Sequence, residues 1–252
     1  MSAPLPENIE DAYPLSPLQQ GMLFHTISSP GSGVYLEQLS VNINQQGFSP
    51  EAFKNCWDLL IQRHSTFRTA FIWQDLKEPL QVVRKNASLV WVEHDWEGED
   101  PTSQDSKLEQ LKQSDRKAEF LLNKAPLMRM TLVRTGKDSY TWIWTRHHLI
   151  ADGWSTNHVV KELKRLYDGS LKGESIVFKP APPYRNYIAW LKQQNRESQQ
   201  AFWKQYLEGV NHRTTLSIET VRKASHWLGN YEEASCLVPA KTFDALEVLC
   251  KS

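Results

Sequence analysis

Two adjacent histidines and a nearby Asp-Gly pair are the residues of this sequence best suited to chemistry. His147 and His148 are followed, after three apolar residues, by Asp152 and Gly153. An imidazole titrates close to neutral pH, so it can take the proton of an amine or hydroxyl group that attacks an acyl group, or orient that group. Such chemistry needs no metal and no serine or cysteine nucleophile. Asp152 can bond an imidazole or pair with a distant arginine, and Gly153 lets backbone approach a ligand closely.

The two histidines also have a simpler interpretation, in which they end a strand with one ring buried and one solvated. The Asp-Gly pair that follows the histidines after three residues favours the functional interpretation. Residues 140–145 are aromatic and β-branched, as in a buried strand. From Ser155 onward the chain opens a helix, with apolar residues at helical spacing over 156–167. The histidines are therefore expected where a strand ends, a common position for groups that face a cleft.

The rest of the chain predicts alternating helices and strands. Ser16-Pro17 and Ser49-Pro50 combine a capping residue with a proline at the first helical position. Further strands are expected near residues 35–45, 67–74, 79–84, 88–95 and 127–134, and further helices at 102–120, 184–192 and 197–208. One strand and one helix are expected within 232–251. This pattern indicates an α/β fold with a mixed sheet flanked by helices.

Four blocks of the sequence resemble the motifs of one family, in that family's order. Residues 147–155, which begin His-His-Leu-Ile-Ala-Asp-Gly, are similar to the core motif of the condensation domains of nonribosomal peptide synthetases. Residues 13–25, 63–71 and 184–190 resemble the first, second and fourth motifs. These domains belong to the chloramphenicol-acetyltransferase-like superfamily. The resemblance implies the first lobe of its two-lobe fold.

The resemblance implies a role for each residue of the core motif. His148 matches the second histidine of the family and would act as the base, or orient the attacking amine. His147 is expected to be structural. Gly153 would let backbone approach the thioester, and its amide could stabilise the developing oxyanion by about 3 kcal/mol.

Two arginines are expected to support the motif from the second block. By the family match Asp152 would pair with an arginine there, and we predict Arg63 as its partner. Arg68 is a weaker candidate for a second support. These residues fix the loop and do no chemistry themselves.

The resemblance also predicts a domain organisation and partners. Residues 1–12 would be a linker tail, 13–208 the N-terminal condensation lobe, and 209–252 the crossing between lobes with an incomplete start of the C-terminal lobe. The reaction would join an acyl or peptidyl thioester to an aminoacyl amine, both carried on phosphopantetheine arms, and no cofactor would be bound directly. Expected partners are the upstream and downstream peptidyl carrier domains, the adjacent adenylation domain and the remainder of the condensation domain, without which we expect no turnover.

Composition excludes several other classes. Lys plus Arg and Asp plus Glu each number 29, so no net field favours nucleic acid or an anionic membrane. No apolar run approaches the roughly 18 residues that a membrane span needs, and the first residues do not resemble a signal peptide. The three cysteines have no paired or metal-ligand spacing, which fits a reducing cytoplasm. The resemblance to condensation domains implies the biosynthesis of secondary metabolites such as antibiotics.

Three alternatives to condensation stay open. An epimerase acting on a carrier-bound aminoacyl or peptidyl thioester shares the His-His-x-x-x-Asp-Gly motif and would give racemised product without a second acyl partner. A non-catalytic domain that binds or recruits carriers would keep the motif as a relic, although the intact His148 and Asp152 count against this. The third alternative is a free-standing acyltransferase that acts on a small alcohol or amine.

Overall fold

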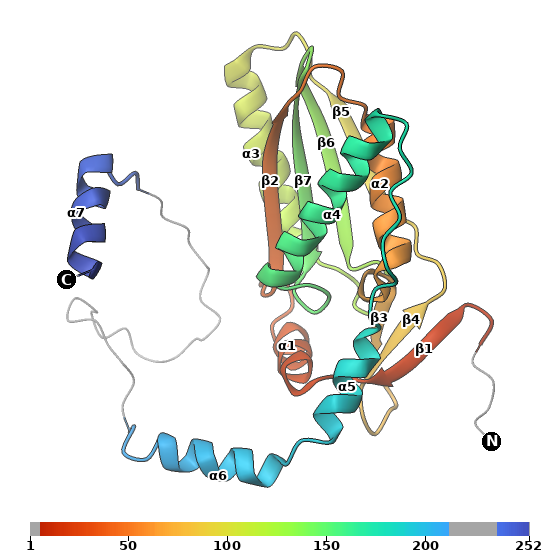
Figure 1. Cartoon of the computed structure of the whole chain (residues 1–252), viewed down its shortest axis with the longest axis vertical. Coiled ribbons are helices and arrows are strands. Elements are labelled where there is room, and N and C mark those ends of the chain that lie inside the picture. The colour runs from red at the N-terminus through yellow and green to blue at the C-terminus, as the bar shows by residue number, and fades with distance from the viewer. Residues whose placement is uncertain (1–5, 212–235, 252) are drawn as a thin grey trace. The chain divides into compact units, whose positions relative to one another are not determined.

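The computed structural model describes residues 6–211 and 236–251, which fall into two compact units, Met1–His212 and Arg213–Ser252. The first unit contains two β-sheets and the helices around them (Figure 1). The described part of the second unit contains helix α7 (Ala240–Lys251). None of the described helices is long and apolar enough to cross a membrane.

A four-stranded sheet forms the centre of the first unit. Its order is β2 (Leu36–Asn44), β7 (Ser139–His147), β6 (Met128–Gly136) and β5 (Val90–Asp95). Strand β7 is antiparallel to both of its neighbours, whereas β5 and β6 run parallel. All residues of β7 except the first are buried, as its aromatic and β-branched sequence predicts.

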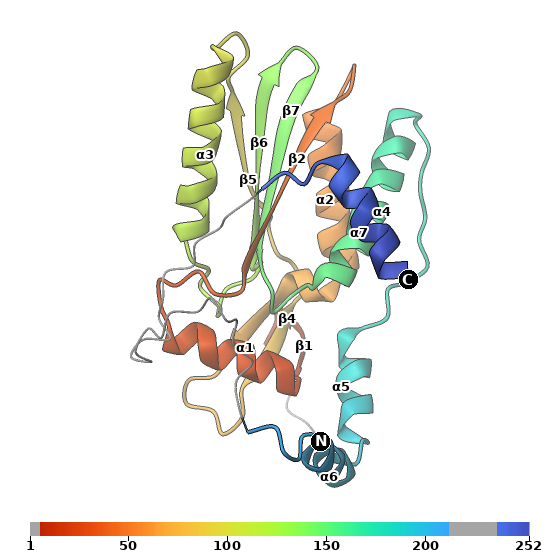
Figure 2. The same ribbon diagram turned by 90° about the vertical axis from the view of Figure 1, so that its left-hand side faces the viewer.

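Helices α2 (Pro50–Arg63) and α4 (Gly153–Leu171) cover one face of this sheet, which we call the tryptophan face (Figure 2). Ser49 caps α2 and is followed by a proline at the first helical position. Trp57 of α2 lies with its ring centroid 5.6 Å from that of Trp142 and 4.9 Å from that of Trp144. These three tryptophans belong to the main hydrophobic cluster, which also includes buried residues of α4. Helix α4 is therefore held against the sheet by close packing.

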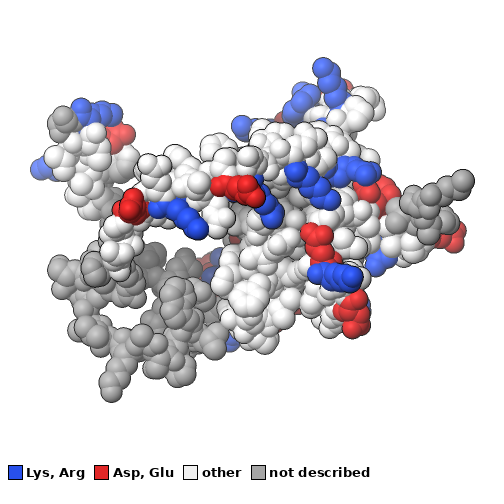
Figure 3. All heavy atoms as spheres, turned by 90° about the horizontal axis from the view of Figure 1, so that it is seen from below, with Lys and Arg blue, Asp and Glu red and all other residues white. Residues whose placement is uncertain are grey.

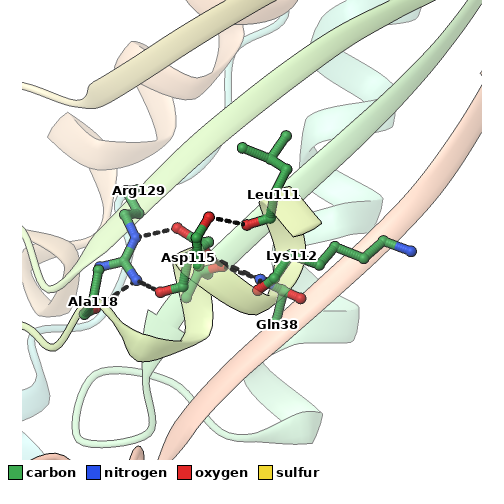
Figure 4. A network of polar contacts seen from close by, with 8 residues as sticks. Gln38, Leu111, Lys112, Asp115, Ala118 and Arg129 are labelled. Carbon is green, nitrogen blue, oxygen red and sulfur yellow. Dashed lines mark hydrogen bonds and ion pairs between the residues drawn. The ribbon is translucent and has the colours of Figure 1, made fainter. Parts of the chain in front are cut away.

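Helix α3 (Pro101–Lys117) covers the opposite face, which we call the α3 face. No residue of this helix is fully buried. Its attachment is polar: Figure 4 shows Asp115 between Arg129 of β6 and Gln38 of β2. Asp115 also accepts a hydrogen bond from Thr145 of β7. Gln38 and Arg129 both lie opposite Thr145 in the strand register, so one carboxylate joins three neighbouring strands.

A smaller antiparallel sheet lies at one end of the first unit. Its order is β1 (Ile9–Pro14), β4 (Leu80–Arg84) and β3 (Thr69–Ile72), and a short 3₁₀ helix, η1 (Ser65–Arg68), precedes β3. Helix α1 (Pro17–Ser28) follows β1, and α5 (Tyr184–Lys192) contacts β1. Helix α6 (Arg196–Tyr206) follows α5 along the chain.

The predicted fold class is confirmed, and the predicted start of the lobe differs at the N-terminal end. Residues 9–12, which the sequence predicted as linker tail, belong to β1, because their backbone pairs antiparallel with residues 82–84 of β4. Of the segment 209–252, residues 212–235 lie outside the described part, including the start of the predicted 232–251 strand and helix. Within the described residues 236–251, helix α7 corresponds to the predicted helix, and residues 236–239 form no strand.

Candidate active site

The motif residues form the connection between β7 and α4. Strand β7 ends at His147, and α4 begins at Gly153. The loop is fixed by backbone hydrogen bonds, since the N–H of His147 donates to the carbonyl of Leu127 at 3.0 Å and that of His148 to the carbonyl of Tyr35 at 2.8 Å. The structure thus brings the two histidines to a strand end, as predicted.

His147 is buried and held by its neighbours. Its Nδ1 accepts a hydrogen bond from the backbone N–H of Leu149 at 3.1 Å, and its Nε2 lies 3.2 Å from the hydroxyl oxygen of Thr26 in α1. Burial, with a smaller contribution from neighbouring His148, lowers the pKa of His147 to about 4. The ring is therefore neutral near pH 7, and its contact with Thr26 links the end of β7 to α1.

His148 faces the pocket described below. Its side chain is 26% exposed, and its Nδ1 lies 2.7 Å from Oε1 of Glu37 on β2. This contact lies within the range of an ion pair, and Nδ1 forms no hydrogen bond with any described residue. The second carboxylate oxygen of Glu37 contacts Arg146. Sequence reasoning missed both Glu37 and Arg146, because no local pattern shows which residue lies opposite another across two strands.

Asp152 is the capping residue of α4. One of its oxygens accepts hydrogen bonds from the backbone N–H of Ser155 at 2.7 Å and from the Ser155 hydroxyl at 2.6 Å. These two bonds lower the pKa of the Asp152 carboxyl. They also orient the carboxylate toward the first turn of the helix, where it complements the exposed N–H groups.

The predicted pair between Asp152 and Arg63 is wrong. Arg63 forms an ion pair with Glu162 in the middle of α4 at 3.0 Å, and His64 lies 2.7 Å from the same carboxylate. The physical reason is that the Asp152 carboxylate is already occupied by its own helix terminus. Arg63 thus joins the end of α2 to α4 and acts on the motif only by fixing that helix.

Arg68 supports a different part of the unit. Its buried guanidinium pairs with Glu10 at 2.5 Å and donates to backbone carbonyls that include those of Ile61 and Arg84. It thereby ties η1 and the end of α2 to β1 and β4. None of its hydrogen bonds reaches the motif loop, so it is no direct support of the site.

Gly153 opens α4 without any steric need for glycine. It does not adopt a left-handed conformation, and a Cβ placed on it would meet no atom within 4 Å. Backbone strain therefore gives no reason for a glycine here. Because Gly153 has no Cβ, it leaves the N-terminus of α4 uncovered.

A pocket of about 260 Å³ lies beside the motif, and its lining includes His148, Asp152, Gln19, Gln81 and Tyr184. Gln19 closes the capping box of α1, and its Nε2 donates to the carbonyl of Leu149 at 3.2 Å. Gln81 of β4 donates in turn to Gln19 at 3.1 Å. These two glutamines, which sequence reasoning missed, tie the motif loop to α1 and to the small sheet.

The tryptophans near the motif divide into two kinds. Trp142 and Trp144 are 3% and 0% exposed and belong to the core, whereas Trp154 in the first turn of α4 is 81% exposed. Only Trp154 is therefore available to a ligand. On the face shown in Figure 3, acidic and basic side chains are mixed among uncharged ones, in keeping with the balanced charge of the sequence.

Comparison with known proteins identifies a family. The Condensation domain family matches residues 9–252. One component of the linear gramicidin synthase of Brevibacillus parabrevis is 35% identical over 245 residues, which cover 97% of this chain and 5% of that protein. One component of the plipastatin synthase of Bacillus subtilis strain 168 is 38% identical over 209 residues, which cover 83% of this chain and 6% of that protein.

Solved structures agree on the fold. A variant of the starter condensation domain of the rhizomide synthetase RzmA superposes with a TM-score of 0.72 at 17% identity, over 82% of this chain and 50% of that one. The holo form of a four-domain nonribosomal peptide synthetase, AB3403, gives a TM-score of 0.65 at 17% identity, over 81% of this chain and 15% of that one. The chain thus spans a small part of the synthases and about half of the first of these structures.

Proposed function

Because the chain belongs to the condensation-domain family, we propose that it takes part in amide-bond formation during nonribosomal peptide synthesis. The donor is an acyl or peptidyl thioester, and the acceptor is the amine of an aminoacyl thioester. Both are carried on phosphopantetheine arms of peptidyl carrier domains, upstream and downstream, and an adenylation domain loads the acceptor. The observation that carries the proposal is the position of His148, at a strand end and on the wall of a pocket.

The arrangement supports a direct acyl transfer. The amine nitrogen attacks the thioester carbonyl, a C–N bond forms, and the carbonyl oxygen takes the negative charge. Collapse of this intermediate breaks the C–S bond and releases the thiol of the donor arm. The nitrogen must lose one proton overall and the departing sulfur must gain one. Nε2 of His148, on the wall of the pocket, would take the proton from the amine and pass it to the sulfur, or would orient the amine.

The remaining motif residues would act around that step. Asp152 fixes the first turn of α4 and with it the loop that carries His148. The N-terminus of α4 has the partial positive charge that favours a developing oxyanion, and Gly153 leaves it uncovered. Buried His147 would keep the loop in place without exchanging protons with substrate.

The test is peptide-bond formation between two loaded carrier proteins, read by mass spectrometry. We expect His148→Ala to reduce turnover by about 10²- to 10⁴-fold, the usual contribution of a positioned acid or base. His94→Ala, at the far edge strand β5, is the matched control and should retain turnover. Full turnover by a folded His148→Ala protein would overturn the catalytic role.

The assay should be run on this chain and on a version extended by about as many residues again. We propose that the remainder of the condensation domain is needed, since the matched part of this chain covers 50% of the solved domain. Product from the extended protein alone fits this proposal, and product from the 252-residue chain contradicts it. Racemised aminoacyl thioester in place of peptide would replace condensation with epimerisation.

A further inference from the structure

Glu37 is shared between the pocket histidine and a buried arginine. The register of β2 and β7 places Glu37 directly opposite Arg146 and its neighbour Leu36 opposite His147. One carboxylate oxygen of Glu37 lies 2.7 Å from Nδ1 of His148, and the other contacts the guanidinium of Arg146. The carboxylate therefore lies between the last residues of β7 and the first residue of the motif loop.

Arg146 holds this carboxylate in place. Its side chain is 6% exposed, and its guanidinium carbon lies 4.5 Å from the ring centroid of Trp144 on the tryptophan face. Burial lowers the pKa of Arg146, and the adjacent charge of Glu37 opposes that change. Two of its nitrogens, Nε and Nη1, have no hydrogen-bond partner among the described residues, so the pair with Glu37 is its main compensation.

The other charged and titratable groups near His148 are occupied elsewhere. Asp152 bonds to the first turn of α4, and buried His147 bonds to Leu149 and to α1. Nδ1 of His148 is fully buried although the ring is partly exposed, so the edge of the ring open to the pocket is the one that carries Nε2. Glu37 is thus the carboxylate in contact with the inner nitrogen.

We propose that Glu37, anchored by Arg146, is a positioning residue that orients the ring of His148 and keeps its proton on Nδ1. A carboxylate beside Nδ1 stabilises the tautomer with the proton on that nitrogen, which leaves Nε2 with a free lone pair. The outer nitrogen then meets the substrate amine as an acceptor. The catalytic consequence rests on the proposed function, whereas the orientation and tautomer of the ring do not.

The test uses two variants in the extended protein of the turnover assay. Glu37→Gln keeps the shape of the side chain and removes its charge. The double variant Glu37→Gln with Arg146→Met replaces the ion pair by two uncharged side chains of similar size. It guards against a folding defect caused by an unpaired buried guanidinium.

The first measurement is the tautomer of His148 by nitrogen-15 NMR of histidine-labelled protein. The signal that disappears in His148→Ala is assigned to His148 and is thereby separated from those of the other histidines. We expect the Nδ1-protonated form in the unaltered protein and a mixture of tautomers in both Glu37 variants. An Nε2-protonated ring in the unaltered protein, or an unchanged tautomer in the double variant, would overturn the proposal.

The second measurement separates kcat from KM with loaded carriers as substrates. We expect kcat to fall by about 10- to 100-fold in both variants with KM within about twofold, because the ring is misoriented while the pocket is intact. Unchanged kcat in the double variant refutes the positioning role if His148→Ala is inactive. Full turnover by His148→Ala refutes the catalytic role of His148 on which this measurement rests, and racemised product in place of peptide refutes the proposed function. In both cases the NMR result still decides the orientation of the ring.

Discussion

On the tryptophan face of the four-stranded sheet, buried aromatic rings fill the space below α2 and α4, whereas on the α3 face a single carboxylate joins the helix to three strands. The first arrangement depends on close packing and the second on directed polar bonds. Helix α4, which follows the motif loop, lies on the packed face. This placement gives the site a rigid base and leaves α3 as the more weakly attached layer.

The largest effect is expected from Trp57→Ala, which empties the centre of the tryptophan face. Trp57 is 0% exposed, and truncation of such a residue costs about 3–5 kcal/mol of unfolding free energy because a cavity remains. Urea unfolding followed by circular dichroism measures the loss. Trp154→Ala, at an exposed position of α4, is the control and should change stability by less than about 0.5 kcal/mol.

Trp57→Phe sharpens this prediction. The indole N–H groups of Trp57, Trp142 and Trp144 have no hydrogen-bond partner among the described residues. Phenylalanine at position 57 keeps a ring in the core and removes one unbonded donor, so we expect a smaller loss than with alanine. Equal losses for the two variants would show that packing around the ring is not what stabilises this face.

Features that depend on residues close together in the sequence could be predicted, whereas contacts between residues far apart could not. The strand before the motif, the helix after it and the serine-proline start of α2 each depend on a few neighbouring residues, and the structure contains all three. The polar partners of the site are not local. Glu37 and His148 are more than one hundred positions apart, and only the register of β2 on β7 brings them together.

The Arg63 prediction failed for the same reason. A sequence shows that an arginine and an aspartate exist, but not which carboxylate is already occupied. Asp152 is bonded to Ser155, three residues ahead, and Glu162 lies nearer to the end of α2. The cap could have been inferred from the Asp-x-x-Ser spacing before a helix, which competes directly with a long-range ion pair.

The next effect concerns His147, which alternation along β7 places on the same side of the strand as Thr145. Its pKa is lowered to about 4 by burial, below the value near 6.5 of an unfolded chain. Between pH 4 and pH 6.5 this histidine is therefore protonated in the unfolded chain and mostly neutral in the folded protein. The stability contributed by neutral His147 is fully present above about pH 6.5 and is lost as the pH falls toward 4, by about 3 kcal/mol at most.

Urea unfolding at pH 7.5 and pH 5 measures this loss. His147→Asn keeps an acceptor for the Leu149 N–H and has no proton to gain, so we expect a weaker decline in its unfolding free energy between the two pH values. His94→Asn, at a partly exposed position in β5, should behave like the unaltered protein. An equal decline in the His147 variant would place the titrating group elsewhere.

The smallest effect is expected from Asp115→Ala, which removes the carboxylate that joins α3 to three strands of the sheet. Arg129, Gln38 and Thr145 would each lose a bond, and partly buried groups left unsatisfied cost about 1–3 kcal/mol together, since water reaches some of them. Asp105→Ala, at an exposed position of the same helix, is the matched control. Hydrogen exchange should show faster opening of α3 with α2 and α4 unchanged, because the tryptophan face does not depend on this carboxylate. Equal acceleration on both faces would mean that the two layers open as one cooperative unit.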